Sequence, residues 1–246
     1  MDDFLTVYKD RKKEIEEFFT LLKFLEVKEN SKHNGKSEFD EFFYSGELPI
    51  NMTYQSFTNI MKSNASLMIY NIIEYTITSL INIIYHEIEK NELSYFDVND
   101  CIRELWKKNM LKGANDPNAN FNTFIKKNND IINAILDKRI VKLEAKNNMP
   151  AGNLDALEID SLFQKHGICI DSKSENFKLS VRIMNKIKQD RNNLGHGSVA
   201  FTEALRENTI DDLENNYIYA KNFLDELIET IIGFLENKDY KRKNTQ

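Results

Sequence analysis

SNASLMIYNIIEYTITSLINIIYH, residues Ser63–His86, carries one formal charge, Glu74, when histidine is counted as neutral. Its apolar side chains fall on most sides of a helix, a pattern typical of a helix buried inside a protein. The segment is also long enough to raise the question of a membrane span. The interspersed serine, asparagine and threonine residues and the central carboxylate favour a soluble core helix instead. We therefore expect a central helix within the protein and no membrane partner.

Glu74 is a candidate functional residue because a carboxylate on such a helix must be paired, hydrogen-bonded or protonated. One interpretation is a structural bond to another helix. The other is that Glu74 orients Arg191 or His196 from a neighbouring helix, together with Tyr70 one turn earlier. If Glu74 and Arg191 form a buried pair, breaking it costs roughly 3–5 kcal/mol.

The other helices follow from helical spacing of apolar residues and from capping residues. Helices are expected over residues 4–29, 97–112, 121–137, about 156–166, 177–194 and 210–235. A long connection is expected over 30–49 and a short extended piece near 139–143. The fold class is therefore all-α: an up-and-down helix bundle forming a single domain over residues 1–246, with a helical insertion at about 92–172.

Composition excludes several classes of protein. Three prolines and eight glycines argue against an all-β fold, and the net charge of −6 does not favour nucleic-acid binding over the whole surface. Cys101 and Cys169 are far apart in sequence, so we expect reduced, buried thiols in a cytoplasmic protein. The N-terminus lacks the pattern of a signal peptide. Scattered histidines and cysteines predict no metal site, and glycine-rich phosphate loops are absent.

A second informative stretch, DRNNLGHG at residues 190–197, ends a long helical segment. Arg191 falls on the apolar arc of that helix, where a guanidinium needs an anionic partner. Gly195 is the expected left-handed residue that stops the helix, which would let His196 swing back beside Arg191. The simpler alternatives are that Arg191 binds the last helix carbonyls and that His196 is structural.

Basic residues are concentrated on the same helix. Lys178, Arg182 and Lys186 fall on the face opposite Arg191 and are most simply solvated. Lys188 is close to Arg191 in angle, so we take it as a candidate for binding the same anion.

The string R-N-N-L-G-H-G at residues 191–197 resembles the R-x(4–6)-H signature of the HEPN superfamily, many of whose members are metal-independent endoribonucleases. Residues 66–74, 152–156 and 166–168, followed by the motif and Phe201, are similar in order to the landmarks of one group of stand-alone prokaryotic HEPN proteins. Gly195 departs from the alanine expected in that group, but both residues are small.

The resemblance implies an endoribonuclease without metal or cofactor, in which the 2′-hydroxyl of the RNA attacks the adjacent phosphate. His196 would transfer protons, because an imidazole exchanges them near neutral pH. Arg191 would stabilise the charge of the transition state. Asn192 or Asn193 would orient the phosphate or the histidine, with Glu74 and Tyr70 in support. Lys188 would be the RNA-binding lysine.

The resemblance also implies a homodimer with a composite active site, because one histidine does not readily serve both the attacking and the leaving oxygen. The biological setting it suggests is a toxin or antiviral defence effector that cleaves tRNA or mRNA and is restrained by an antitoxin or defence-complex protein. The alternative is a non-catalytic HEPN module that binds a nucleotide or a partner protein.

Overall fold

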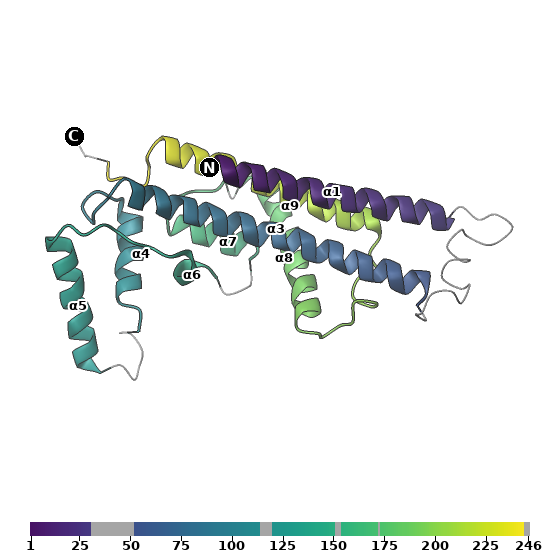
Figure 1. Ribbon diagram of the computed structural model, residues 1–246, viewed down its shortest axis with the longest axis horizontal. Helices are drawn as coiled ribbons and strands as arrows, with labels where there is room; N and C mark the ends of the chain where they lie inside the picture. Colours follow the sequence, from purple (N-terminus) through teal and green to yellow (C-terminus); the bar gives the residue numbers. More distant parts are fainter. Residues whose placement is uncertain (31–51, 114–119, 151–153, 172, 244–246) are drawn as a thin grey trace. The chain divides into compact units, whose positions relative to one another are not determined.

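The computed structural model describes residues 1–30, 52–113, 120–150, 154–171 and 173–243. Within these residues, eight α-helices pack as a bundle, and β-structure is limited to two isolated bridges (Figure 1). The helices are α1 (Asp2–Asn30), α3 (Tyr54–Lys90), α4 (Asp100–Met110), α5 (Phe121–Leu136), α6 (Ala145–Asn148), α7 (Ala156–Gln164), α8 (Glu175–Gly195) and α9 (Ile210–Glu236). The expected all-α class is confirmed.

The helices match the expected segments closely, with differences at their ends. The central helix α3 extends beyond Ser63–His86 in both directions, and α6 has no counterpart among the expected helices. The extended piece near 139–143 is a single antiparallel bridge between Ser94 and Ile140. Most of the expected connection at 30–49 lies outside the described residues.

Contacts divide the chain into two compact units. The first unit comprises residues 1–76 and 175–223, and the second comprises 77–174 and 224–246. The expected insertion at about 92–172 falls inside the second unit. The single-domain organisation stays a prediction.

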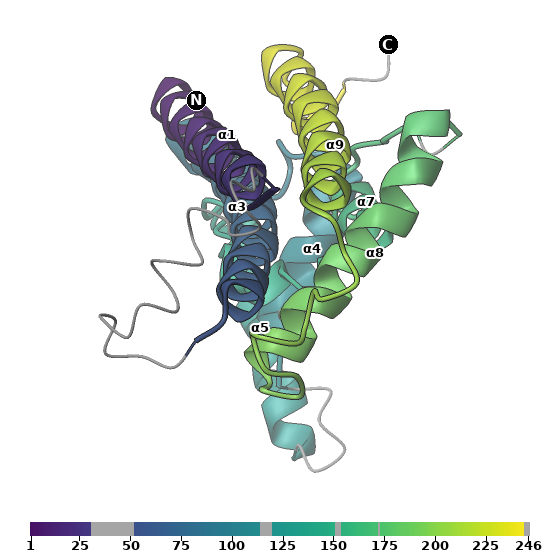
Figure 2. The ribbon, with the colours of Figure 1, turned by 90° about the vertical axis from the view of Figure 1, so that its right-hand side faces the viewer.

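Four helical segments build the first unit: α1, the start of α3, α8 and the start of α9. Phe4 on α1 stacks on Tyr75 of α3, with 6.1 Å between ring centroids. Tyr217 on α9 donates a hydrogen bond of 3.1 Å to Glu16 of α1. Figure 2 shows α8 lying obliquely to α1 and to the start of α3 and α9. The first unit carries all the residues of the predicted site, which are Tyr70 and Glu74 on α3 and residues 188–196 at the end of α8.

Capping residues fix the helix ends in the second unit. Asp155 caps α7 as expected, accepting hydrogen bonds from the amides of Leu157 and Glu158, and Gly167 ends it with a φ of 81°. His166 is fully buried between the Tyr85 hydroxyl and the Leu162 carbonyl, each 2.7 Å away. Burial lowers the pKa of His166 to about 4. This neutral, bonded imidazole has a structural role.

The two cysteines differ from the expectation of buried thiols. Both are free, but Cys169 is exposed and Cys101 is half-buried. The expectation was wrong for Cys169 because it lies in the irregular segment after α7, which a helical pattern does not describe.

Helix α3 is, among the described helices, the one long and apolar enough to cross a membrane. Half of its most apolar window is buried inside the protein. Core helices of soluble proteins pass the same test, and the absence of a membrane partner stays a prediction.

Candidate functional site

The last turns of α8 position the predicted site residues. Apolar side chains at helical spacing bury one stripe of this helix against the first unit, and the stripe ends at Leu194. Arg191 lies at the edge of this stripe, with 30% of its side chain exposed. The helix therefore holds the guanidinium at the margin of the core rather than inside it.

Two residues of α3 contact the Arg191 guanidinium. Its central carbon lies 4.9 Å from the centroid of the Tyr70 ring, within the range of a cation–π interaction. Nη2 lies 4.0 Å from Oε1 of Glu74. Tyr70 is fully buried, so its ring is a fixed platform for the cation. The structure thus brings together Arg191, Glu74 and Tyr70, which is the arrangement expected under the second of the two interpretations of Glu74.

The Glu74–Arg191 pair is more exposed than expected. The Glu74 side chain is 35% exposed, and 4.0 Å exceeds hydrogen-bonding distance. A pair this accessible to water contributes at most about 1 kcal/mol, because solvent screens its attraction. The expected cost of roughly 3–5 kcal/mol for breaking a buried pair was therefore too high.

The guanidinium keeps hydrogen-bonding capacity for a ligand. Nη1 of Arg191 donates a hydrogen bond of 3.1 Å to Oδ1 of the neighbouring Asn192. A guanidinium has five N–H donors in a planar fork that matches phosphate geometry. With one of these donors used inside the described structure, Arg191 is oriented and still able to bind an anion.

The end of α8 differs from the expectation at Gly195. Gly195 is the last helical residue and lacks a positive φ, whereas Gly197 has a φ of 67°. Ser198 N donates to Asn193 O at 3.0 Å, and Gly197 N donates to Leu194 O at 3.2 Å. These two bonds form a Schellman motif with Gly197 as its left-handed residue. The sequence offers two glycines for this role, and these backbone hydrogen bonds select the second.

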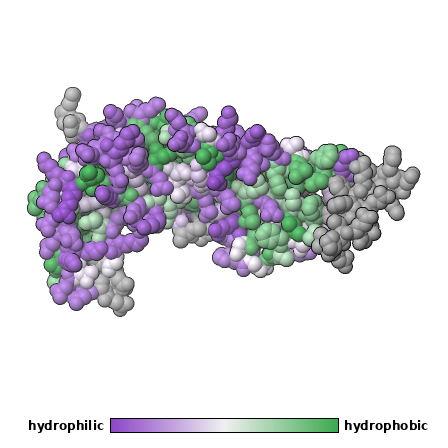
Figure 3. Space-filling view, in the orientation of Figure 1, coloured by the Kyte–Doolittle hydropathy of each residue, from purple (hydrophilic) through white to green (hydrophobic). Residues whose placement is uncertain are grey.

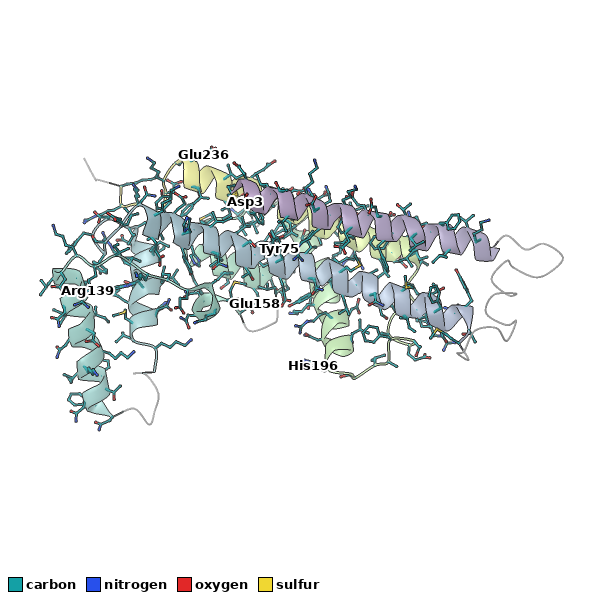
Figure 4. The ribbon with its side chains drawn as sticks, in the orientation of Figure 1. Asp3, Tyr75, Arg139, Glu158, His196 and Glu236 are labelled. Atoms are coloured by element: carbon teal, nitrogen blue, oxygen red, sulfur yellow. The ribbon has the colours of Figure 1, made fainter. Side chains whose placement is uncertain are left out.

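His196 consequently continues the helical turn instead of swinging back. Its amide donates to Asn192 O at 3.0 Å, and its side chain is exposed. Figure 4 shows His196 at the tip of α8. Within the described residues no hydrogen bond or ion pair joins His196 to Arg191. The predicted pairing of the two residues within one chain is not formed.

The remaining predicted site residues surround Arg191 along α8. Asn192 and Lys188 are half-buried, and Asn193 is exposed with its carbonyl in the helix-ending motif. The expected solvated face is confirmed, since the basic side chains of that face are exposed; they are Lys178, Arg182 and Lys186.

Asp190 is a residue of the site region that the sequence analysis missed. Its Oδ2 is buried without a hydrogen-bond partner in the described structure. Burial raises the pKa of this carboxyl to about 6, against the opposing effect of the Lys186 charge. The signal was present, because Asp190 lies three residues after Ile187 and four before Leu194, on the buried stripe.

A second missed feature is a polar row on α3, made of Asn59, Lys62 and Ser63. All three side chains are buried, and burial lowers the pKa of Lys62. They donate hydrogen bonds to main-chain carbonyls of the segment that follows the motif: Asn59 to Thr202 at 2.7 Å, Ser63 to Phe201 at 2.9 Å and Lys62 to Asn208 at 2.9 Å. These three hydrogen bonds hold the segment after His196 against α3, the helix that also carries Tyr70 and Glu74.

Comparison with protein-family models identifies the chain. Residues 5–240 match the family described as HEPN_MAE_28990-like HEPN. The chain belongs to the HEPN family. Members of this family are generally associated with ribonuclease activity, and HEPN domains commonly dimerise. Searches of curated proteins and of solved structures find no significant match to this HEPN chain.

Proposed function

We propose that this HEPN protein is a metal-independent endoribonuclease. The observation that carries the proposal is the Arg191 guanidinium, which is oriented by Tyr70 and Glu74, retains open N–H donors and lies one turn from the exposed His196. A fixed cation and an accessible imidazole are the groups that cleavage of a phosphodiester by its own 2′-hydroxyl requires.

In the proposed reaction, the 2′-oxygen forms a bond to phosphorus while the bond from phosphorus to the 5′-oxygen breaks. The products are a 2′,3′-cyclic phosphate and a free 5′-hydroxyl. A neutral His196 imidazole accepts the proton of the 2′-hydroxyl, and a second, protonated His196 imidazole donates a proton to the departing 5′-oxygen, so that the protons balance. Arg191 donates hydrogen bonds to the phosphate oxygens, whose negative charge increases in the transition state. Asn192 holds the guanidinium, and Lys188 binds the RNA backbone.

A second copy of the chain completes the proposed site. Each chain supplies one motif histidine, whereas in-line displacement needs a base at one oxygen and an acid at the other. Figure 3 shows a hydrophobic surface over the first half of α3 and the segment after α8. Apolar residues there remain half-buried or exposed in the single chain; they include Phe57, Ile60, Met61, Val199 and Phe201. Dimerisation through this surface, which we call the motif face, would bring two Arg191–His196 sets together.

The biological part of the proposal rests on the family alone. We propose that the protein is a toxin or antiviral effector that acts on tRNA or mRNA in the cytoplasm and is restrained by a partner protein.

The test is incubation of the purified protein with total RNA in the presence of EDTA. Wild type should yield fragments with 2′,3′-cyclic phosphate ends, and Arg191→Ala and His196→Ala should yield none. Lys178→Ala, on the solvated face of the same helix, is the matched control and should cleave normally. Equal cleavage by wild type and both motif variants would overturn the proposal.

Mixing the two inactive variants tests the composite site. A heterodimer of Arg191→Ala with His196→Ala chains keeps one Arg191 and one His196, so a shared cleft should recover part of the activity. No recovery, despite heterodimer formation shown by mass, would contradict a shared site.

The alternative function is a non-catalytic module that binds phosphate. It is favoured by one observation: His196 forms no hydrogen bond or ion pair with Arg191 in the described single chain. Under this alternative, RNA or a nucleotide binds with loss of affinity in Arg191→Ala and stays intact with every variant.

A further inference from the structure

Helix α5 exposes a stripe of large apolar side chains. The helix contacts α4 in the second unit, where it buries Ile131 and Ala134. On another side its apolar residues are open to solvent, most of all Phe121 at 72% and Leu136 at 74% exposure. The full exposed set is Phe121, Phe124, Ile125, Ile132 and Leu136. Figure 3 shows hydrophobic residues along the outer edge of this helix.

These residues form one continuous surface. At about 100° per residue, positions 121, 125, 132 and 136 fall within about 60° of one another around the helix. Asn128 and Asn129 lie halfway along the length of the same stripe, one at each of its long edges. Single exposed apolar residues are common, whereas a contiguous exposed stripe marks a surface that binds something. We call residues 121, 125, 128, 129, 132 and 136 the α5 stripe.

The α5 stripe has the same pattern when its sequence is followed in either direction. From the N-terminus it runs Phe121, Ile125, Asn128, Asn129, Ile132, Leu136, which gives apolar, apolar, asparagine, asparagine, apolar, apolar. The spacings of four, three, one, three and four residues are symmetric about the midpoint of the asparagine pair. An interface formed by two identical copies about a twofold axis requires such a self-complementary surface.

The composition of the stripe also fits a second copy. None of its residues is charged, and interface cores are depleted of charged residues. A charged partner would therefore gain no ion pair there. In an antiparallel pair of α5 helices, Phe121 faces Leu136 of the second copy and Ile125 faces its Ile132. The asparagines meet at the centre, where a polar pair in an apolar seam fixes the register.

We propose that α5 is a self-association surface, which pairs antiparallel with α5 of a second copy about an axis between residues 128 and 129. This contact lies in the second unit and does not depend on the proposed ribonuclease activity. A helix of this length spans about 24 Å at 1.5 Å per residue, so the interface falls at the small end of the range, below ~1,200 Å². The association is therefore weak and concentration-dependent.

Joined with dimerisation at the motif face, the α5 contact gives assemblies larger than a dimer. Two different twofold contacts on one chain produce either a closed tetramer or an open chain. The proposed self-association would then raise the local concentration of active sites at high protein concentration.

Cysteine cross-linking tests the antiparallel arrangement directly. The background variant is Cys101→Ser/Cys169→Ser, because both native thiols are free and Cys169 is exposed. Chains carrying Phe121→Cys are mixed with chains carrying Leu136→Cys and a mass tag, and the mixture is oxidised. The expected product is the disulfide between positions 121 and 136. Each variant alone should give little dimer, because two copies of position 121 lie about 22 Å apart along the helix pair.

Sedimentation equilibrium with a matched pair of variants tests the energetic claim. Ile125→Glu places a charge in the α5 stripe, and Thr123→Glu places the same charge on another exposed side of α5. Self-association should weaken at least tenfold in Ile125→Glu and stay unchanged in Thr123→Glu. RNA cleavage per chain at low concentration should be the same in both.

Three outcomes would overturn the proposal. One is equal self-association of wild type and Ile125→Glu. Another is a cross-linked product of Phe121→Cys chains alone that matches or exceeds the mixed product, which would mean a parallel pair. The third is capture of a different protein that binds the α5 stripe more tightly than a second copy does. None of these results bears on whether His196→Ala abolishes cleavage, so failure here is distinguishable from failure of the proposed function.

Discussion

Oε1 of Glu74 lies 4.0 Å from Nη2 of Arg191, a distance at which two charges attract without sharing a hydrogen bond. The carboxylate therefore directs the guanidinium without occupying one of its N–H donors. A direct bidentate pair would have used two of them. Arg191 is in this way oriented by α3 and still able to bind a phosphate.

Glu74→Gln should reduce RNA cleavage with a small loss of stability. The expected decrease in the free energy of unfolding is below about 1 kcal/mol, because the pair is partly exposed. His196→Ala should abolish cleavage at an unchanged melting temperature, since the imidazole is exposed. Thermal unfolding and cleavage are measured on the same preparations. A loss of roughly 3 kcal/mol or more in Glu74→Gln would show that the pair behaves as a buried one.

Arg191→Lys should lower cleavage at least tenfold even though the charge is kept. The ammonium group lacks the planar fork that stacks over Tyr70 and that binds two phosphate oxygens at once. Single-turnover cleavage and RNA affinity are measured together, and affinity is expected to fall less than the rate. Arg182→Lys is the control, because that side chain is exposed on the solvated face. Full activity of Arg191→Lys would mean that charge alone suffices.

Asp190→Asn should stabilise the protein above about pH 6. The pKa of Asp190 is raised to about 6 by burial, whereas an aspartate in an unfolded chain titrates near 3.9. The stability contributed by protonated Asp190 is therefore fully present below about pH 4 and is lost as pH rises through about 6. Asparagine does not ionise, so the melting temperatures of variant and wild type should differ least at pH 4 and most at pH 8.

His166 has the opposite pH dependence and must be separated from that of Asp190. Its pKa is lowered to about 4, so its contribution is present above about pH 6.5 and is lost as pH falls through about 4. Comparing Asp190→Asn with wild type at each pH cancels the His166 contribution, which both proteins share. A difference independent of pH would contradict the assignment to Asp190.

Lys62→Met should loosen the segment after the motif. The variant keeps the apolar stem but removes the Nζ atom that donates to the carbonyl of Asn208. The loss of a hydrogen bond from a charged donor costs about 1.5–3 kcal/mol, and relief of the buried charge offsets part of that cost. Hydrogen exchange should become faster over residues 201–208. Lys178→Met, at an exposed position, should leave both stability and exchange unchanged.

Helical periodicity predicted the all-α fold and most helix bounds, because the apolar residues that form the buried face of a helix recur at helical spacing in its own sequence. The bounds of α5 and α9 were close for this reason, and so was the position of Arg191 near an apolar stripe. The degree of burial was not predictable in the same way. Ser63–His86 is apolar on most sides, so its sequence does not say which side stays open to water beside Glu74.

The parts of the site that were missed depend on residues far apart in the chain. The side chains of the polar row on α3 donate hydrogen bonds to carbonyls more than a hundred residues later in the chain. No local pattern around Asn59 or Ser63 predicts these partners. The choice between Gly195 and Gly197 was equally hidden, because either residue can adopt a left-handed conformation. The hydrogen bonds from the amides of Gly197 and Ser198 place the left-handed residue at Gly197.

The polar row also limits how far His196 can travel. The buried side chain of Leu194 fixes the segment on one side, and the bond from Ser63 to the Phe201 carbonyl fixes it on the other. Between these anchors the chain is short, so the imidazole explores a small volume. Confinement of this kind raises the effective concentration of a reactive group before any substrate arrives. Inserting residues after Ser198 would lower the effective concentration of the His196 imidazole at the phosphate and would leave every side chain of the motif unchanged.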